Sequence, residues 1–447
     1  MGPSTSAAAA IAGGVTGGVT PAAAAYAAAA GRRKSEVPTE YDGATSTPGP
    51  PRNILERIPT YLQPSLPWRR RLLHFTFAWY TLTMSTSGIA LLLALTPHRF
   101  PGLDYIGLVI FLLDLLFFAF ITVAIALRFA LYKDALVHAF THPGEALFVP
   151  TFWLSIAAIL SNVSEYSRMF LPAEGGNTLA DFMEITFWIY LAVTFASSVF
   201  QYHMLFTVKE ERRLQVSTMT PAWILPIFPV MLAGTLAGAA SKLQSPEHSV
   251  SILCAGLAAQ GLGFWVSVFF YSTYLSRLMA FGLPVQRPGM FIAVGPPSFT
   301  CAALVGMANR VPEVFKALTD SQQIRYLSEH GDQETLAAGI RLLALNVGIF
   351  FWGVSFWFFV SAMAAVVASG MPDRRFHLSW WSFVFPNVGF VISTIRIGSA
   401  LSSEGLLWMS TVMTALLFLA WAFIAIRCAM AVRKREIMWP GHDEDST

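Results

Sequence analysis

Two arginines, Arg287 and Arg396, stand near the ends of long apolar segments, where an ionised side chain is costly to bury. The guanidinium stays protonated and presents a fork of N–H donors that fits a carboxylate. At the mouth of a pathway through a membrane, such a group attracts anions. For both arginines the alternative stays open: the side chain reaches toward the lipid headgroups or pairs with a carboxylate on another helix.

Hydroxyl and amide side chains are concentrated in the same kind of segment. Serine and threonine inside a helix ordinarily donate to a carbonyl of the preceding turn. Their concentration here predicts a pathway lined by hydroxyls and freed backbone groups, which bind an anion without a full buried charge. The candidate substrate-binding residues are Thr83, Ser85, Ser298, Thr300, Asn387, Arg287 and Arg396.

Three other ionisable residues lie in or beside the apolar segments. For Arg128 we expect either a side chain that reaches the interface or an ion pair between helices. Asp114 and Glu184 are expected to pair with other groups among the outer helices. None of the three is a first choice for binding an anion.

Catalytic and metal-binding patterns are absent from the sequence. His142 and Glu145 lie near each other, but no second pair of metal ligands accompanies them. The cysteines Cys254, Cys301 and Cys428 lie in apolar segments without metal-site spacing. No serine-nucleophile, zinc-protease or phosphate-loop motif occurs. We therefore expect no enzyme activity and no cofactor, and the dispersed net charge of +3 predicts no nucleic-acid partner.

The elements that must position these groups are membrane helices. Of the 447 residues, 55% are hydrophobic and 12% are charged, against about 25% charged in soluble domains. A helix needs about 20 mostly apolar residues to cross the hydrocarbon layer. Ten segments reach that length, at 74–95, 105–131, 145–163, 181–207, 221–241, 249–280, 289–309, 337–368, 379–400 and 405–432.

The ten segments alternate in character. The even-numbered segments contain no proline, whereas prolines interrupt the third, fifth, seventh and ninth, and the first carries a polar run from Thr83 to Ser87. A proline frees a carbonyl, which is tolerated beside other helices or water but not in lipid. The pattern predicts an all-α protein in which odd helices lie inside, even helices lie outside, and five helical hairpins surround an axis. Prolines that merely shape helix packing are the alternative for any single position.

The positive charges predict orientation and domain limits. Lysines and arginines are denser in the segments before the first span, after the last, and in alternate connections, which places both termini in the cytosol. Residues 1–67 are expected to be a disordered cytosolic tail and lead-in, residues 68–435 the transmembrane transport domain, and residues 436–447 a cytosolic tail. The expected location is the plasma membrane.

Four motifs carry a resemblance to a known family: 220–229 (TPAWILPIFP), 260–265 (QGLGFW), 287–299 (beginning RPGMF) and 381–390 (WSFVFPNVGF). Together they resemble the tellurite-resistance/dicarboxylate transporter family, and in particular its fungal malic acid transporter branch. The resemblance extends over about residues 68 to 442. It implies ten helices as five hairpins around a central pore, and three protomers that each have a pore.

The resemblance also implies a substrate and a gate. The implied substrate is malate or a similar four-carbon dicarboxylate. In related anion channels a phenylalanine on the ninth helix blocks the pore, and the matching position here is Phe385, with Phe383 as the second choice. Two alternatives stay open within the family: a sulfite efflux transporter of a sister branch, and a passive anion channel.

Overall fold

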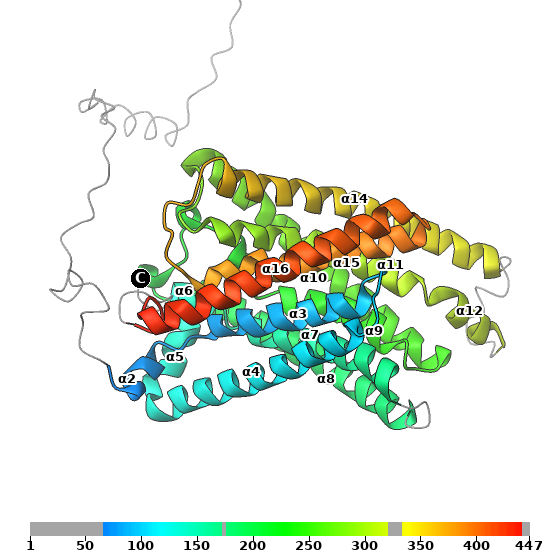
Figure 1. Cartoon of the computed structure of the whole chain (residues 1–447), viewed down its shortest axis with the longest axis horizontal. Coiled ribbons are helices and arrows are strands. Elements are labelled where there is room, and N and C mark those ends of the chain that lie inside the picture. Colours follow the sequence, from blue (N-terminus) through cyan, green and yellow to red (C-terminus); the bar gives the residue numbers. More distant parts are fainter. Residues whose placement is uncertain (1–65, 172–175, 321–332, 440–447) are drawn as a thin grey trace, which may run out of the picture. The chain divides into compact units, whose positions relative to one another are not determined.

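The computed structural model describes residues 66–171, 176–320 and 333–439, and every regular element in these ranges is a helix (Figure 1). The expected N-terminal tail, 1–67, lies outside the described residues apart from 66–67, and the expected C-terminal tail, 436–447, apart from 436–439, so the predictions about them stay predictions. Nine helices in the described ranges are long and apolar enough to cross a membrane.

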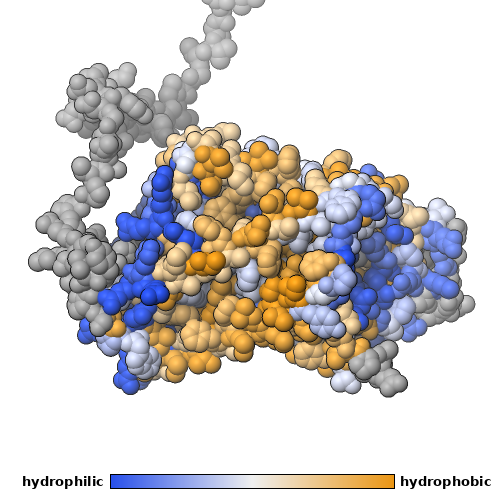
Figure 2. All heavy atoms as spheres, viewed as in Figure 1, coloured by the Kyte–Doolittle hydropathy of each residue, from blue (hydrophilic) through white to orange (hydrophobic). Residues whose placement is uncertain are grey.

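One class of helices is long and unbroken. Its members are α4 (Leu103–Leu131), α8 (Gly176–Thr207), α10 (Pro246–Phe281), α14 (Gln333–Val367) and α16 (Glu404–Lys434). Only 22% to 39% of their most apolar stretches is buried, so they turn large apolar side chains outward. Figure 2 shows the result on one face, a hydrophobic band between two hydrophilic ends. A surface of this kind is stable against lipid, and the protein is a multi-pass membrane protein.

The second class consists of shorter helices that follow a short lead-in. They are η3 (Phe77–Trp79) with α3 (Tyr80–Leu95), α6 (Pro143–Ala146) with α7 (Thr151–Phe170), η7 (Pro221–Ile224) with α9 (Phe228–Ala240), η8 (Arg287–Val294) with α11 (Gly295–Ala308), and η9 (Leu378–Phe383) with α15 (Phe385–Ala400). Proline occupies the first turn of α9, α11 and α15, and Pro150 precedes α7. Because the first turn needs no N–H donor, these prolines begin the main helices instead of breaking them.

Burial separates the two classes. The most apolar stretches of the spans that contain α3, α7, α11 and α15 are 83%, 61%, 89% and 78% buried. Contacts run from α3 to α7, α9, α11 and α15 in turn and return from α15 to α3, so these five helices form a closed ring. The odd-numbered segments, expected inside from their prolines and polar run, are therefore more buried than the even-numbered segments, expected outside.

Two expected segments end elsewhere in the structure. The third, expected at 145–163, continues as α7 to Phe170, because Glu165 and Arg168 lie within the helix and are paired there. The fifth, expected at 221–241, contains only 13 α-helical residues, because the α-helix begins only at Phe228, after Pro226 and with Pro229 in its first turn. It is too short to count among the nine membrane-length helices, although η7 precedes it.

The remaining helices lie in the connections: α2 (Trp68–Leu73), α5 (Lys133–Thr141), η5 (Glu210–Arg212), η6 (Val216–Thr218) and α12 (Val311–Asp320). A buried ion pair ties one connection to the helices. Both terminal nitrogens of Arg128 on α4 donate to the Glu145 carboxylate on α6, with Nη2 to Oε2 at 2.9 Å. Nη1 of Arg128 also donates to the Phe75 carbonyl at 3.3 Å. Of the two expectations for Arg128, the structure shows the ion pair.

The other two ionisable residues differ from each other. Glu184 Oε2 on α8 lies 3.4 Å from His248 Nδ1 on α10, which is the kind of pairing expected among outer helices. Asp114 is fully buried on α4 and, among the described residues, has no ion-pair partner. The expected pairing of Asp114 with another group of the outer helices is not seen among the described residues.

Candidate functional site

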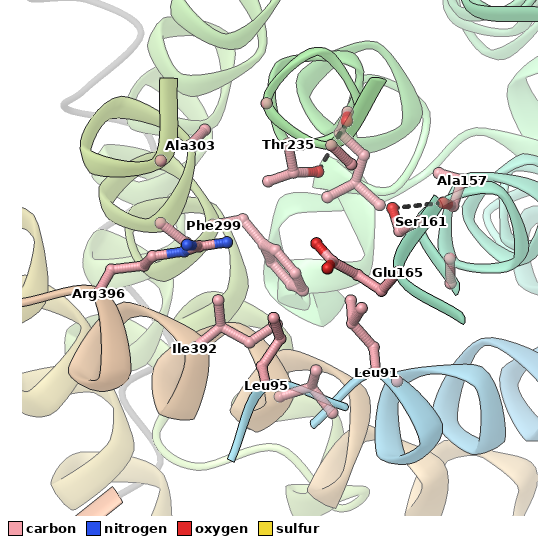
Figure 3. A pocket seen from close by; sticks show the side chains of 18 of the residues that line it. Leu91, Leu95, Ala157, Ser161, Glu165, Thr235, Phe299, Ala303, Ile392 and Arg396 are labelled. Atoms are coloured by element: carbon pink, nitrogen blue, oxygen red, sulfur yellow. Dashed lines mark hydrogen bonds between the residues drawn. The ribbon is translucent and has the colours of Figure 1, made fainter. Parts of the chain in front are cut away.

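A cavity of about 70 Å³ lies inside the ring of α3, α7, α9, α11 and α15 (Figure 3). Every one of the five helices contributes to its wall. The lining residues are Gly88, Leu91 and Leu95; Ala157, Ala158, Ser161 and Glu165; Leu232, Thr235, Gly238, Ala239 and Lys242; Phe299, Ala302, Ala303 and Gly306; and Phe385, Val388, Ile392 and Arg396. Positions recur every three or four residues, so each helix turns one face toward the cavity. The wall is mostly apolar, and its ionised groups gather near the C-terminal ends of these helices.

Aromatic rings close in on the cavity near the start of α11 and α15. The Phe385 and Phe299 rings are stacked, with centroids 5.3 Å apart and planes inclined by 30°. Phe228 of α9 meets both rings edge-on, with its centroid 6.2 Å from Phe385 and 5.8 Å from Phe299. Phe385 is only 2% exposed. Three helices thus place a packed aromatic cluster at this end of the cavity.

Glycine makes this cluster possible. A Cβ on Gly389 would lie 2.7 Å from two ring carbons of Phe299, and a Cβ on Gly295 would lie 2.6 Å from Cζ of Phe228. Both distances are well below an ordinary carbon–carbon contact. Gly389 therefore lets α15 approach the Phe299 ring, and Gly295 lets α11 approach the Phe228 ring. A larger side chain at either position would displace the ring.

The opposite end of the cavity is charged. Glu165 of α7 accepts hydrogen bonds from Lys242 Nζ and from Arg168 Nη1, the latter at 3.2 Å. Burial lowers the pKa of Lys242, the positive charge of Arg396 lowers it further, and the Glu165 carboxylate opposes both effects. Two cations and one anion line the cavity, so the wall carries a positive excess.

Arg396 is the other cation in the wall, and it differs from Lys242 in its contacts. The structure shows neither a hydrogen bond nor an ion pair for its guanidinium among the residues it describes. In Figure 3 its side chain extends from α15 into the cavity toward Glu165 of α7. A guanidinium in a partly buried, mostly apolar wall offers its N–H donors to any anion that enters.

The hydroxyls of the wall are already engaged. Ser161 donates to the Ala157 carbonyl and Thr235 donates to the Leu232 carbonyl, both at 2.8 Å (Figure 3). Each is the local bond that serine or threonine makes inside a helix. Their oxygens can still accept a hydrogen bond, but the donors that an anion needs come from Arg396 and Lys242.

Of the predicted site residues, the structure brings Phe385 and Arg396 to the cavity. Four predicted hydroxyls lie buried in helix contacts outside its wall. Thr83 donates to the Tyr80 carbonyl at 2.9 Å and also contacts Ser155 Oγ at 2.6 Å, while Ser85 donates to the Trp381 carbonyl at 3.4 Å. Ser298 donates to the Gly295 carbonyl at 2.9 Å, and Thr300 donates to the Pro296 carbonyl at 2.7 Å.

The other predicted residues also lie elsewhere. Asn387 and Phe383, the second choice for the gate, line a separate apolar groove of about 470 Å³ beside α14 and α16. There Asn387 Nδ2 donates to the Phe383 carbonyl at 2.9 Å. Arg287 Nη1 donates to the carbonyls of Ala365, at 3.0 Å, and Gly370, which ties the start of η8 to the end of α14.

Four residues that form the ends of the cavity were not singled out from the sequence: Phe228, Phe299, Glu165 and Lys242. A signal for the last two was present. Both charges follow the apolar stretch of an interrupted segment, at the same end as Arg396 in its own segment. The phenylalanines carry no comparable signal in a chain with 36 of them.

Comparison with known proteins identifies the family. Residues 74–429 match the family described as voltage-dependent anion channel. The chain is 31% identical over 391 residues to a malic acid transport protein of Schizosaccharomyces pombe, which covers 86% of this chain and 84% of the relative. A putative malic acid transport protein of the same yeast is also 31% identical, over 86% of this chain and 85% of the relative.

A more distant relative is named for the transport of a different anion. The chain is 27% identical over 335 residues to a sulfite efflux pump of Trichophyton rubrum, which covers 74% of this chain and 83% of that protein. The resemblance inferred from the four motifs is thereby confirmed. The chain belongs to the voltage-dependent anion channel family, and it is a membrane transporter of anions and not an enzyme.

Proposed function

We propose that this protein carries malate and related four-carbon dicarboxylates across the plasma membrane through the cavity inside the five-helix ring. The observation that carries the proposal is Arg396, a guanidinium without a partner among the described residues that extends into a cavity all five inner helices line. The two relatives at 31% identity, whose names state malic acid transport, support the choice of substrate.

The proposed architecture has ten transmembrane helices in five hairpins, with odd helices around a central pore and even helices outside. The closed contact ring and the burial difference support it. In this arrangement η7 and α9 together form the fifth crossing, from Pro221 to Ala240. Three protomers, each with its own pore, and cytosolic termini complete the proposal; these two points rest on the family resemblance and the charge pattern.

In the proposed binding mode, one carboxylate of the substrate accepts the N–H donors of Arg396. A planar guanidinium can hold both oxygens of a carboxylate, which fixes orientation as well as charge. The binding role expected for Thr83, Ser85, Ser298, Thr300 and Asn387 would require these groups to leave their present hydrogen bonds. We therefore place the main binding role on Arg396.

Phe385 is the proposed gate. Its ring lies in the cavity wall, and packing against Phe299 and Phe228 holds it there. An anion that moves along the ring axis must displace this cluster. The gate and the anion-binding group therefore lie on one face of α15, separated along the helix.

Uptake of labelled malate into proteoliposomes tests the proposed function. Wild-type protein should accumulate malate, and Arg396→Ala should raise KM about tenfold or more, the effect of losing a charged hydrogen bond of roughly 1.5–3 kcal/mol. Arg396→Lys should retain part of the affinity, because it keeps the charge and loses the fork. Absence of malate uptake by folded wild-type protein would overturn the proposal.

Two alternatives are separated by the same preparation. Sulfite efflux has support from the relative at 27% identity, and rescue of sulfite sensitivity in cells, without malate uptake, would favour it. A passive channel has support from the description of the family, and large chloride or nitrate currents in patch-clamp recordings would favour that reading.

A further inference from the structure

We propose that Glu165 is a built-in competitor for the transported anion: its carboxylate occupies the cations at the charged end of the cavity until a substrate carboxylate displaces it. The inference rests on the proposed function, because it concerns the same cavity. In this proposal Glu165 lowers the affinity for the substrate anion by repelling it and by competing for its cations, whereas Arg396 raises that affinity by attracting the anion.

The first observation is the position of the carboxylate. Glu165 lines the cavity on α7, and its side chain is 8% exposed. In Figure 3 it extends into the same space as Arg396, from the opposite side of the cavity. A substrate carboxylate on Arg396 would therefore lie in the electrostatic field of Glu165 with little water between them to screen it.

The second observation is the pairing. Glu165 uses both oxygens, one for Lys242 Nζ and one for Arg168 Nη1. It therefore neutralises the second cation of the cavity wall and leaves Arg396 as the remaining one. These are the contacts that a transported carboxylate would make in the same place, since ammonium and guanidinium groups bind either carboxylate with the same chemistry.

The third observation is the apolar remainder of the wall. The other lining residues are aliphatic, aromatic or glycine, apart from Ser161 and Thr235, which donate to their own helices. The charge balance of the cavity therefore depends on three side chains. Removing the single negative one changes the balance from one net positive charge to two, which favours anion entry.

The test compares Glu165→Gln with Glu184→Gln in proteoliposomes, with labelled malate and chloride as separate probes. Glu184 is a matched control: it carries the same charge near the same end of the helices, but it contacts His248 on the outer helices and does not line the cavity. Glu165→Gln should lower the malate KM about tenfold, the order expected for one unit charge acting within a poorly screened site. Glu184→Gln should leave KM within about twofold of the wild-type value.

A second variant guards against loss of folding. Lys242→Gln removes one of the two cations paired with Glu165 and takes one positive charge from the cavity wall, so KM should rise. In the double variant Glu165→Gln/Lys242→Gln, KM should fall back toward the wild-type value. Thermal unfolding of each purified variant reports whether the protein is folded.

The outcomes separate the two proposals. If wild-type protein transports malate and folded Glu165→Gln shows an unchanged or higher KM, the competitor role is wrong while the proposed function stands. If wild-type protein moves chloride but no malate, the malate proposal is wrong, and a higher chloride affinity in Glu165→Gln still supports the competitor role.

Discussion

Phe385 of α15 and Phe299 of α11 lie face to face, with ring centroids 5.3 Å apart, at the aromatic end of the cavity. The contact joins two inner helices that start with the same device, a short 3-10 helix followed by an α-helix with proline in its first turn. Because that device sets where each helix begins, it also sets the height of each ring along the axis. The proposed gate, Phe385, is thus positioned by segments that the sequence marks with proline.

Phe385→Ala should increase anion flux, because it removes one of the three rings that close the cavity. Patch-clamp or proteoliposome flux measures the change. The matched control is Phe383→Ala, since Phe383 lines the separate groove and packs against Phe291, with ring centroids 5.0 Å apart. Removal of a buried phenylalanine costs about 3–5 kcal/mol of stability, so thermal unfolding must accompany the flux. Equal flux from both folded variants and wild type would contradict the gate.

Gly389→Ala should disturb the gate without touching Phe385. The added Cβ would lie 2.7 Å from the Phe299 ring, so either the ring or α15 has to move. We expect altered flux together with a lower melting temperature. Gly261→Ala is the control, because no atom lies within 4 Å of the position of its added Cβ. The same flux for the two alanine variants would show that the Phe299 ring does not contribute to closure.

How much of this site the sequence could predict depends on what kind of signal each residue leaves. Arg396 is recognisable because an ionised group inside an apolar segment is rare. The lead-in and first-turn prolines mark the inner helices in the same way. Which side of an inner helix faces the cavity leaves no such signal. Nearly every face of these helices is buried, so the sequence has no polar face that would mark the cavity side. The sequence therefore assigns Ser298 and Thr300 to an inner helix, α11, but it does not show that their side chains point away from the cavity.

The expected end of the third segment shows a second limit of prediction. A hydropathy pattern stops an apolar segment at its first charges, yet α7 continues through Glu165 to Phe170. The Glu165 carboxylate is tolerated in the helix because two cations neutralise it: Arg168, one turn later on α7, and Lys242, on another segment. Pairing between distant segments cannot be read from one segment alone.

Arg287→Ala should change stability more than affinity. Its guanidinium holds carbonyls near the end of α14 and does not line the cavity, so the malate KM should stay near the wild-type value. Arg396→Ala, in contrast, should raise KM with little change in melting temperature, because no partner among the described residues is lost. Measuring KM and thermal unfolding for both variants separates the two roles. A raised KM in folded Arg287→Ala would show that this arginine does contribute to anion binding.

Arg128 and Glu145 should stabilise the fold as a pair. Both side chains are almost fully buried and hydrogen-bonded to each other, so removing one leaves the other charge uncompensated. Glu145→Gln should therefore lower the free energy of unfolding by about 3–5 kcal/mol. Glu184→Gln, which removes a half-buried charge facing a histidine, should change it far less. Thermal and denaturant unfolding in detergent compare the two, and equal losses would contradict a special role for the buried pair.

Anion affinity should fall as pH rises, and Lys242 sets the sign. Burial and the positive charge of Arg396 lower the pKa of Lys242, so its ammonium loses its proton at a lower pH than an ordinary lysine. Once neutral, Lys242 no longer offsets Glu165, and the cavity loses one positive charge. The malate KM should therefore rise toward alkaline pH in wild-type protein, at a pH where malate itself is fully ionised. Lys242→Arg keeps the charge at every accessible pH and should flatten this limb; a limb that is identical in both proteins would assign the titration to another group.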